Sequence, residues 1–239
     1  MSTEIAPTGR AVPTVRFLHA SDVHVDDRPD GTLGLRLLVE AARAHQVDLV
    51  LLVGDTFDHN RVHPETLQAF VDALSLLEVP VVVLPGNHDP LMDGSVYERI
   101  ELPGHVHLMR LAEGDVVELE DLELELWGRA HTSFADNRPL TDVPPRGSRP
   151  WQVALAHGHL VRYPDDRHRS YLITSEEISA CDRDYVALGH WDVQHDVSAG
   201  GVTAWYSGSP SRKGACTLVT LSVGQDGDRT VAVQPLTLA

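Results

Sequence analysis

The stretch that decides the fold is Leu49-Val-Leu-Leu-Val-Gly-Asp-Thr-Phe-Asp58, in which an apolar run leads directly into a glycine and two aspartates. A short, continuous apolar run indicates a strand covered on both faces, as in a parallel sheet. The two carboxylates therefore stand at the carboxyl end of a buried strand. In open α/β sheets that end of the strands is where ligands bind.

Strand and helix alternate on both sides of this stretch. Strands are predicted at residues 15–20, 47–53 and 79–84. Helices are predicted at 33–45 and from Pro64 onward, because apolar residues recur there at helical spacing and proline suits a first helical turn. This βαβαβ order implies right-handed crossovers and a parallel core.

The second half of the chain has a different pattern. Leucines alternate with acidic residues over 116–127, which predicts a half-buried strand or hairpin. The Pro-, Arg- and Asp-rich residues 136–150 predict a loop. Further strands are expected at 152–156, 185–188, 202–206, 217–222 and 230–236. We expect one domain over 15–239, preceded by a disordered leader at 1–14.

The composition narrows the class of protein. The 239 residues carry a formal net charge of −16, and a surface this acidic opposes nonspecific binding along a phosphate backbone. It does not oppose an enzyme that acts on one phosphate. Two cysteines are too few for a disulfide framework. Without a long apolar run or a signal peptide, the chain is expected to be cytoplasmic.

Residue types that bind metal ions follow five of the predicted strands. We expect these strand ends to meet at one edge of a sheet, where carboxylates, imidazoles and an amide suit one or two divalent cations. Asp22 and His24 lie two apart in a predicted extended segment, so both side chains should point the same way. Asp55 would bridge two ions. The remaining candidates are Asn87, His157 and His190, with His159 as an alternative to His157.

His88 is the candidate general acid. Two ions about 3.5–4 Å apart activate a hydroxide and clamp a phosphoryl group, and the leaving oxygen then needs a proton. His88 is placed to donate it, with Asp89 predicted to orient the ring and raise its pKa. Asp58 is either a partner of a ligand histidine or a loop cap. Arg61 is a candidate phosphate contact, and Trp191 either stacks on a base or forms a wall of the pocket.

The order Asp-x-His, Gly-Asp-x-x-Asp, Gly-Asn-His-Asp, His and Gly-His resembles the calcineurin-like metallophosphoesterase superfamily from about residue 15 to 213. Residues 19–22, 54–58, 185–190 and 206–210 resemble its SbcD-type DNA-repair exonuclease branch. The resemblance implies an α/β fold, a four-layer αββα sandwich. It also implies two metal sites, the first formed by Asp22, His24, Asp55 and Asp192, and the second by Asp55, Asn87, His157 and His190. Two divalent ions are expected, with Mn²⁺ preferred and Fe, Zn and Mg as alternatives.

The chain departs from this family pattern in two ways. Asp192 stands where the family usually has a second histidine, so we expect an altered metal preference, with weakened binding as the competing interpretation. No cap domain is evident after Lys213, which argues against processive degradation of duplex DNA.

The leading hypothesis is a dinuclear metal-dependent phosphoesterase that works by attack of a metal-activated hydroxide. Its expected substrates are phosphodiesters, either single-stranded nucleic-acid ends or nucleotides. The alternatives are a small-molecule phosphomonoesterase and a non-catalytic scaffold or regulatory subunit. The resemblance also implies a coiled-coil ATPase partner, and no membrane association is expected.

Overall fold

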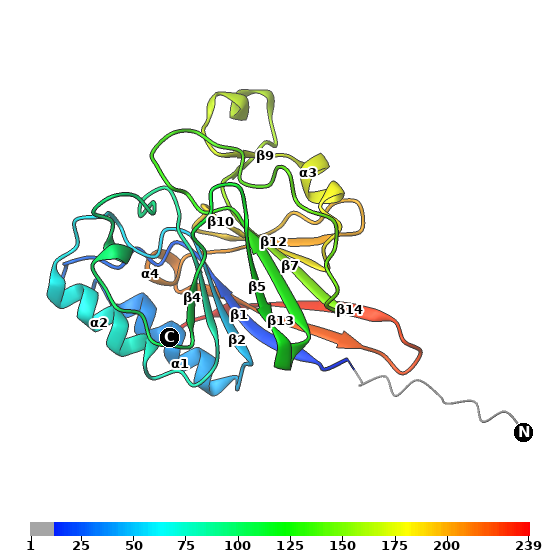
Figure 1. Ribbon diagram of the computed structural model, residues 1–239, viewed down its shortest axis with the longest axis horizontal. Coiled ribbons are helices and arrows are strands. Elements are labelled where there is room, and N and C mark those ends of the chain that lie inside the picture. Colours follow the sequence, from blue (N-terminus) through cyan, green and yellow to red (C-terminus); the bar gives the residue numbers. More distant parts are fainter. Residues whose placement is uncertain (1–11) are drawn as a thin grey trace, which may run out of the picture.

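The computed structural model describes residues 12–239, so most of the predicted leader at 1–14 lies outside the described residues. Two six-stranded sheets form the centre of the molecule (Figure 1). The first sheet has the order β14-β13-β1-β2-β3-β4. Its strands are β1 (Val15–Ala20), β2 (Leu49–Val53), β3 (Val81–Leu84), β4 (Val106–Leu108), β13 (Ala215–Val223) and β14 (Arg229–Thr237). Strands β1, β2 and β3 are parallel, as predicted; β4, which the sequence analysis did not predict, extends the parallel part, and β13 and β14 are antiparallel additions.

The second sheet has the order β11-β12-β10-β7-β6-β5. Its strands are β5 (Asp115–Leu119), β6 (Leu124–Gly128), β7 (Trp151–His157), β10 (Tyr185–Gly189), β11 (Gln194–Asp196) and β12 (Thr203–Ser207). The predicted hairpin at 116–127 is the antiparallel pair β5 and β6. It is half-buried only in β5, because β6 lies inside the sheet beside β7 and is buried throughout.

Strand β2 explains why the sheets pack face to face. Leu49, Leu51 and Val53 point into the core between the two sheets, whereas Val50 and Leu52 point into the core beneath the helices. Both faces are therefore apolar, and burying each of these side chains stabilises the fold by about 1.5–3 kcal/mol. The continuous apolar run reflects this double coverage.

Helices cover the outer faces unequally. Helices α1 (Leu33–Ala44) and α2 (Pro64–Leu74) lie together against the first sheet. The second sheet is covered by the short helix α3 (Ser175–Ala180) and by the 136–150 loop, which contributes Leu140 to that core. The predicted four-layer arrangement is confirmed, with a thin fourth layer (Figure 1).

Several shorter elements connect the layers. A two-stranded sheet pairs β8 (His159–Leu160) with β9 (Leu172–Ile173), and α4 (Pro210–Lys213) precedes β13. Three 3₁₀ turns occur at Val96–Glu98, Glu120–Leu122 and Pro164–His168. Across residues 12–239, none of the helices has both the length and the apolar character needed to span a bilayer.

The predicted meeting of five strand ends at one edge of a single sheet is wrong in one respect. Strands β1, β2 and β3 belong to the first sheet, whereas β7 and β10 belong to the second. Their carboxyl ends converge because the two sheets are stacked, so the candidate site spans both layers.

Candidate metal centre

The tightest group of candidate ligands joins β2, β3, β7 and β10. The Oδ1 atom of Asn87 lies 3.2 Å from His157 Nε2 and 3.2 Å from His190 Nδ1. Asp55 Oδ2 lies 3.2 Å from the same His157 nitrogen. We call these four residues the inner cluster. Oxygen and imidazole donors gathered around one point suit a borderline divalent cation such as Mn²⁺, Fe²⁺ or Zn²⁺.

The His157 ring is held in one orientation. It is fully buried, and its Nδ1 lies 2.9 Å from the carbonyl oxygen of Val53. A donor at Nδ1 leaves Nε2 to face the cluster, which is the arrangement expected of a metal-binding imidazole. Gly54 (φ +81°) is required beside it, because a Cβ there would overlap His157 Nδ1.

A second group, the outer cluster, contains Asp22, His24 and Asp192, whose ligand atoms lie within 4.8 Å of one another. The predicted extended backbone is wrong here. Asp22 (φ 54°) and His24 (φ 48°) both have left-handed conformations. Their N–H groups donate to the carbonyl oxygens of Gly54 and Asp55, both at 3.0 Å. This tertiary pairing overrides strand alternation, yet the two side chains still meet, with Asp22 Oδ1 3.9 Å from His24 Nε2.

Each of two central carboxylates is anchored through one oxygen. Asp22 Oδ2 accepts from the His190 N–H at 2.9 Å, and Asp55 Oδ1 accepts from the His88 N–H at 2.8 Å. Their other oxygens face the clusters. The backbone therefore fixes both carboxylates before any ion binds, which lowers the reorganisation that binding requires.

Asp58 contacts both histidines of its neighbourhood. Its Oδ1 lies 3.0 Å from His24 Nδ1, in poor alignment for a hydrogen bond. Its carbonyl oxygen lies 2.9 Å from His88 Nδ1. Of the two interpretations of Asp58, the structure therefore favours the partner of a candidate ligand histidine. His88 itself is half-exposed, with Nε2 3.9 Å from Asp55 Oδ2.

Asp89 does not orient His88 as predicted. Its buried carboxyl accepts hydrogen bonds from the Gly86 and Phe57 N–H groups at 2.7 and 3.0 Å, and from the Tyr97 hydroxyl at 2.6 Å. Burial, reinforced by Asp55, raises the pKa of Asp89 to about 6. Asp89 therefore holds the Gly86-Asn87-His88 turn, and the Asp58 carbonyl orients His88.

Asp192 lies beside the guanidinium of Arg212, a contact that the sequence analysis did not predict. Its Oδ2 is 3.3 Å from Arg212 Nη1, and the other terminal nitrogen of Arg212 is 3.9 Å from Asp58 Oδ1. Arg212 belongs to α4, which is attached to the outer cluster by hydroxyl groups. Ser209 donates to the Asp22 carbonyl oxygen at 2.6 Å, and Ser211 donates to that of Val23.

Burial and mutual charge shift the pKa values of the clusters in opposite directions. Burial would lower the pKa of His157, but Asp55 outweighs it and raises that pKa to about 9. Burial is also the largest influence on Asp55 and would raise its pKa, yet the interactions with His157 lower that pKa below the usual range. His190 has its pKa lowered to about 3, mainly by burial and then by His157. The Asp55 carboxylate and the His157 imidazole therefore each favour the charged form of the other.

The structure separates the remaining candidates. Trp191 stacks on Tyr206 at 4.2 Å, donates to His159 Nδ1 at 3.1 Å, and has Arg162 over its ring. Tyr206 and Arg162 therefore pack against the Trp191 ring, an arrangement that favours a structural role for Trp191, while base stacking stays a prediction. His159 is engaged with Trp191 and takes no part in the inner cluster. Arg61 lines a hollow beside His88.

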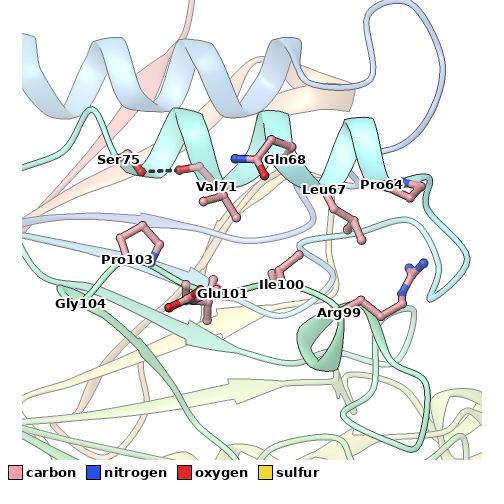
Figure 2. A pocket seen from close by; sticks show the side chains of 11 residues that line it. Pro64, Leu67, Gln68, Val71, Ser75, Arg99, Ile100, Glu101, Pro103 and Gly104 are labelled. Atoms are coloured by element: carbon pink, nitrogen blue, oxygen red, sulfur yellow. Dashed lines mark hydrogen bonds between the residues drawn. The ribbon is translucent and has the colours of Figure 1, made fainter.

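A separate groove of about 650 Å³ lies between α2 and residues 99–104 (Figure 2). Leu67 and Val71 line its helical side, and Ile100 lines the other (Figure 2). None of the candidate metal ligands borders this groove, so the chemistry is expected at the two clusters.

Several known proteins are similar in sequence or in fold to this chain. The model of the calcineurin-like phosphoesterase family matches residues 15–194. The uncharacterized metallophosphoesterase YhaO of Bacillus subtilis (strain 168) is 26% identical over 223 residues, which are 81% of this chain and 52% of YhaO. A subunit of the nuclease SbcCD from the same organism is 25% identical over 266 residues, covering 90% of this chain and 67% of that protein.

Two further matches come from other bacteria. The 3′,5′-cyclic adenosine monophosphate phosphodiesterase CpdA of Escherichia coli (strain K12) is 26% identical over 160 residues, 61% of this chain and 55% of CpdA. The crystal structure of TT1561 of Thermus thermophilus has a TM-score of 0.56 at 12% identity, covering 92% of this chain and 99% of that one. This last likeness concerns the fold alone.

The chain spans about half to two thirds of the length of the curated relatives it matches. The predicted enzyme class, a metal-dependent hydrolase of phosphoesters, is confirmed at the level of the family. The family match covers about three quarters of the chain, including every strand that carries a candidate ligand. The chain belongs to the calcineurin-like phosphoesterase family.

Proposed function

We propose that this chain hydrolyses phosphodiesters at nucleic-acid ends or in nucleotides, with two divalent ions, Mn²⁺ being preferred, in the inner and outer clusters. The observation that carries the proposal is the convergence of Asp55, Asn87, His157 and His190 within 3.2 Å contacts, with the half-exposed His88 beside them. Ions bound there lower the pKa of water and offset the charge of a phosphoryl group.

His88 is proposed to protonate the leaving oxygen. Its Nδ1 is satisfied by the Asp58 carbonyl, so Nε2 carries a transferable proton only when the ring is cationic. The Nε2 atom lies 3.9 Å from Asp55 Oδ2, so this nitrogen faces the proposed metal ligands, where the phosphoryl group would bind.

The remaining residues position these groups. Asp89 fixes the turn that presents Asn87 and His88, through bonds to two backbone N–H groups and Tyr97. The proposed ligand set is Asp22, His24, Asp55 and Asp192 for the outer ion, and Asp55, Asn87, His157 and His190 for the inner one.

The choice of a diester rests on charge and on similarity. A net charge of −16 disfavours tracking along duplex DNA but leaves a single phosphodiester accessible. Two relatives carry names that describe a nuclease subunit and a cyclic-nucleotide phosphodiesterase. Both activities break a phosphodiester bond, so this bond type is the common expectation.

The test is Mn²⁺-dependent cleavage of an end-labelled single-stranded oligonucleotide and of a cyclic nucleotide, with His88→Ala protein alongside. Products from the unaltered protein only would support the proposal, and their sizes would give the polarity. Cleavage of an aryl phosphomonoester alone would support the phosphomonoesterase alternative. No turnover by folded, metal-loaded protein would leave the scaffold alternative.

A coiled-coil ATPase partner is proposed from the resemblance and from the name of one relative, which describes it as part of a larger nuclease. Co-purification of tagged full-length protein from its own cells, followed by identification of any large ATPase, tests it. Recovery of this chain alone would count against such a partner.

A further inference from the structure

A hollow of about 570 Å³ opens beside His88. Its walls come from the segment after β2, from the turn after β3 and from the loop after β6. Its lining includes Asn60, Arg61, His88, Met92, Asp93 and Phe134. Its volume lies within the range of ligand pockets, about 300–1,000 Å³.

The walls of this hollow are fixed by hydrogen bonds. The Asn60 amide donates to the Pro90 carbonyl at 2.9 Å and accepts from the Val96 N–H at 3.0 Å. The Leu91 N–H donates to the His131 carbonyl at 2.8 Å, which joins the β3 turn to the loop bearing Phe134. The Tyr171 hydroxyl donates to the Phe134 carbonyl at 3.2 Å. The hollow is therefore preformed rather than a gap between loose loops.

Phe134 differs from the other phenylalanines of the chain. Phe17, Phe57 and Phe70 are 0% exposed, whereas Phe134 is 63% exposed. Its ring borders the hollow together with the thioether of Met92, so the hollow has one apolar, aromatic side. A flat apolar ring that is open to solvent can stack on a heterocyclic base.

The position of the hollow relative to His88 identifies what would occupy it. A general acid protonates the leaving oxygen, and His88 lines the hollow, so a leaving group that contacts His88 would extend into it. The guanidinium of Arg61 and the carboxylate of Asp93 add polar groups around the apolar side. An apolar face with polar edges matches a purine or pyrimidine base, whereas a small alkyl alcohol would leave the hollow empty.

We propose that this hollow binds the nucleoside of the leaving group, with its base stacked on Phe134. The proposal rests on the proposed phosphodiesterase function for the role of His88. It narrows the substrate class to diesters whose leaving alcohol is a nucleoside.

The first test measures binding without hydrolysis. Adenosine carries no phosphate, so its binding to Mg²⁺-loaded protein, followed by saturation-transfer NMR, reports on the hollow alone. Phe134→Ala is expected to weaken adenosine binding about 5- to 150-fold, the range of base–aromatic stacking. Phe134→Trp should retain it. Leu76→Ala, which removes another exposed apolar side chain that does not line the hollow, should change nothing.

The second test compares two diesters of the same nucleotide, one with a nucleoside and one with methanol as the leaving alcohol. Phe134→Ala should raise KM for the first and leave the second unchanged. Equal adenosine affinity in the unaltered and Phe134→Ala proteins would overturn the proposal, as would absence of adenosine binding to the unaltered protein. Failure to hydrolyse any ester, with adenosine binding that depends on Phe134, would instead reject the proposed function and keep the nucleoside site.

Discussion

The inner and outer clusters are neighbours that were built differently. The inner cluster places its four residues at the ends of strands from both sheets, with contacts of 3.2 Å and the fully buried His157. The outer cluster draws Asp192 from a loop, leaves its side chain 34% exposed and pairs it with Arg212. A ligand set fixed by packing should bind one ion tightly, whereas a set with a competing cation should bind its ion weakly and exchange it readily.

The largest loss of activity and of bound metal is expected when both clusters are disabled at once. Asp55→Asn removes a negative charge that both clusters share. Losing a residue that only supports a metal ligand costs up to about 100-fold, so losing the shared ligand should lower activity by more than that. Metal content by mass spectrometry should drop with it, while circular dichroism stays unchanged. Asp72→Asn, on the surface of α2, is the matched control. Retention of two tightly bound ions in Asp55→Asn protein would contradict a shared ligand.

Disabling the clusters one at a time measures their separate strengths. His157→Ala should weaken the tighter of the two Mn²⁺ binding steps about 100-fold or more, because a buried, oriented imidazole is lost. Asp192→Ala should weaken only the looser step, about tenfold. Titration calorimetry distinguishes the two steps. Equal losses in both variants would show that the clusters do not differ as their burial suggests.

The metal affinities of the two clusters should also depend differently on pH. The pKa of His157 is raised to about 9, so below that pH an inner ion must displace a proton. In Asp192→Ala protein, inner-site affinity should therefore rise about tenfold per pH unit from pH 6.5 to 9 and level off above. His24 has its pKa lowered by burial, and Asp22 has its pKa raised to about 6. Outer-site affinity should thus stay nearly flat above pH 6.5. The affinity can be measured from the electron paramagnetic resonance signal of free Mn²⁺. An inner-site affinity that does not change with pH would rule this expectation out.

The smallest effect concerns Arg212. Its half-exposed ion pair with Asp192 is worth about 0.2–1 kcal/mol, so Arg212→Ala should tighten outer-ion binding only about 1.4- to 5-fold. Arg212→Lys keeps the charge and should behave like the unaltered protein. Weaker outer binding in Arg212→Ala would mean that Arg212 supports the ligand rather than competing for it.

Much of the fold follows from local pattern. The apolar run at β2 predicts a strand covered on both faces, and the structure confirms this because the strand lies between α-helices and a second sheet. The predicted start at residue 47 is two residues early. The Asp48 N–H bonds to the Arg16 carbonyl outside the strand proper, a detail without a compositional signal.

The site was predictable in its membership and less so in its geometry. The left-handed backbone of Asp22 and His24 depends on carbonyl groups of a different strand, so their own neighbours in sequence could not reveal it. Asp89 was misassigned because adjacency in sequence to His88 suggested contact, whereas the chain turns its carboxyl inward to Tyr97. Arg212 was missed although its segment resembled the family. Only the folded α4 brings it to Asp192.

The attachment of α4 to the residues after β1 also sets an order of events during synthesis. Ser209 and Ser211 bond to carbonyls 187 and 188 positions earlier in the chain, and β13 pairs directly with β1. Contacts between such distant segments close late, because a long loop must be ordered first. The residues up to α4 must therefore have been synthesised before the outer cluster can assume its shape. Nascent chains that end before α4 should therefore bind the outer ion more weakly than the full chain.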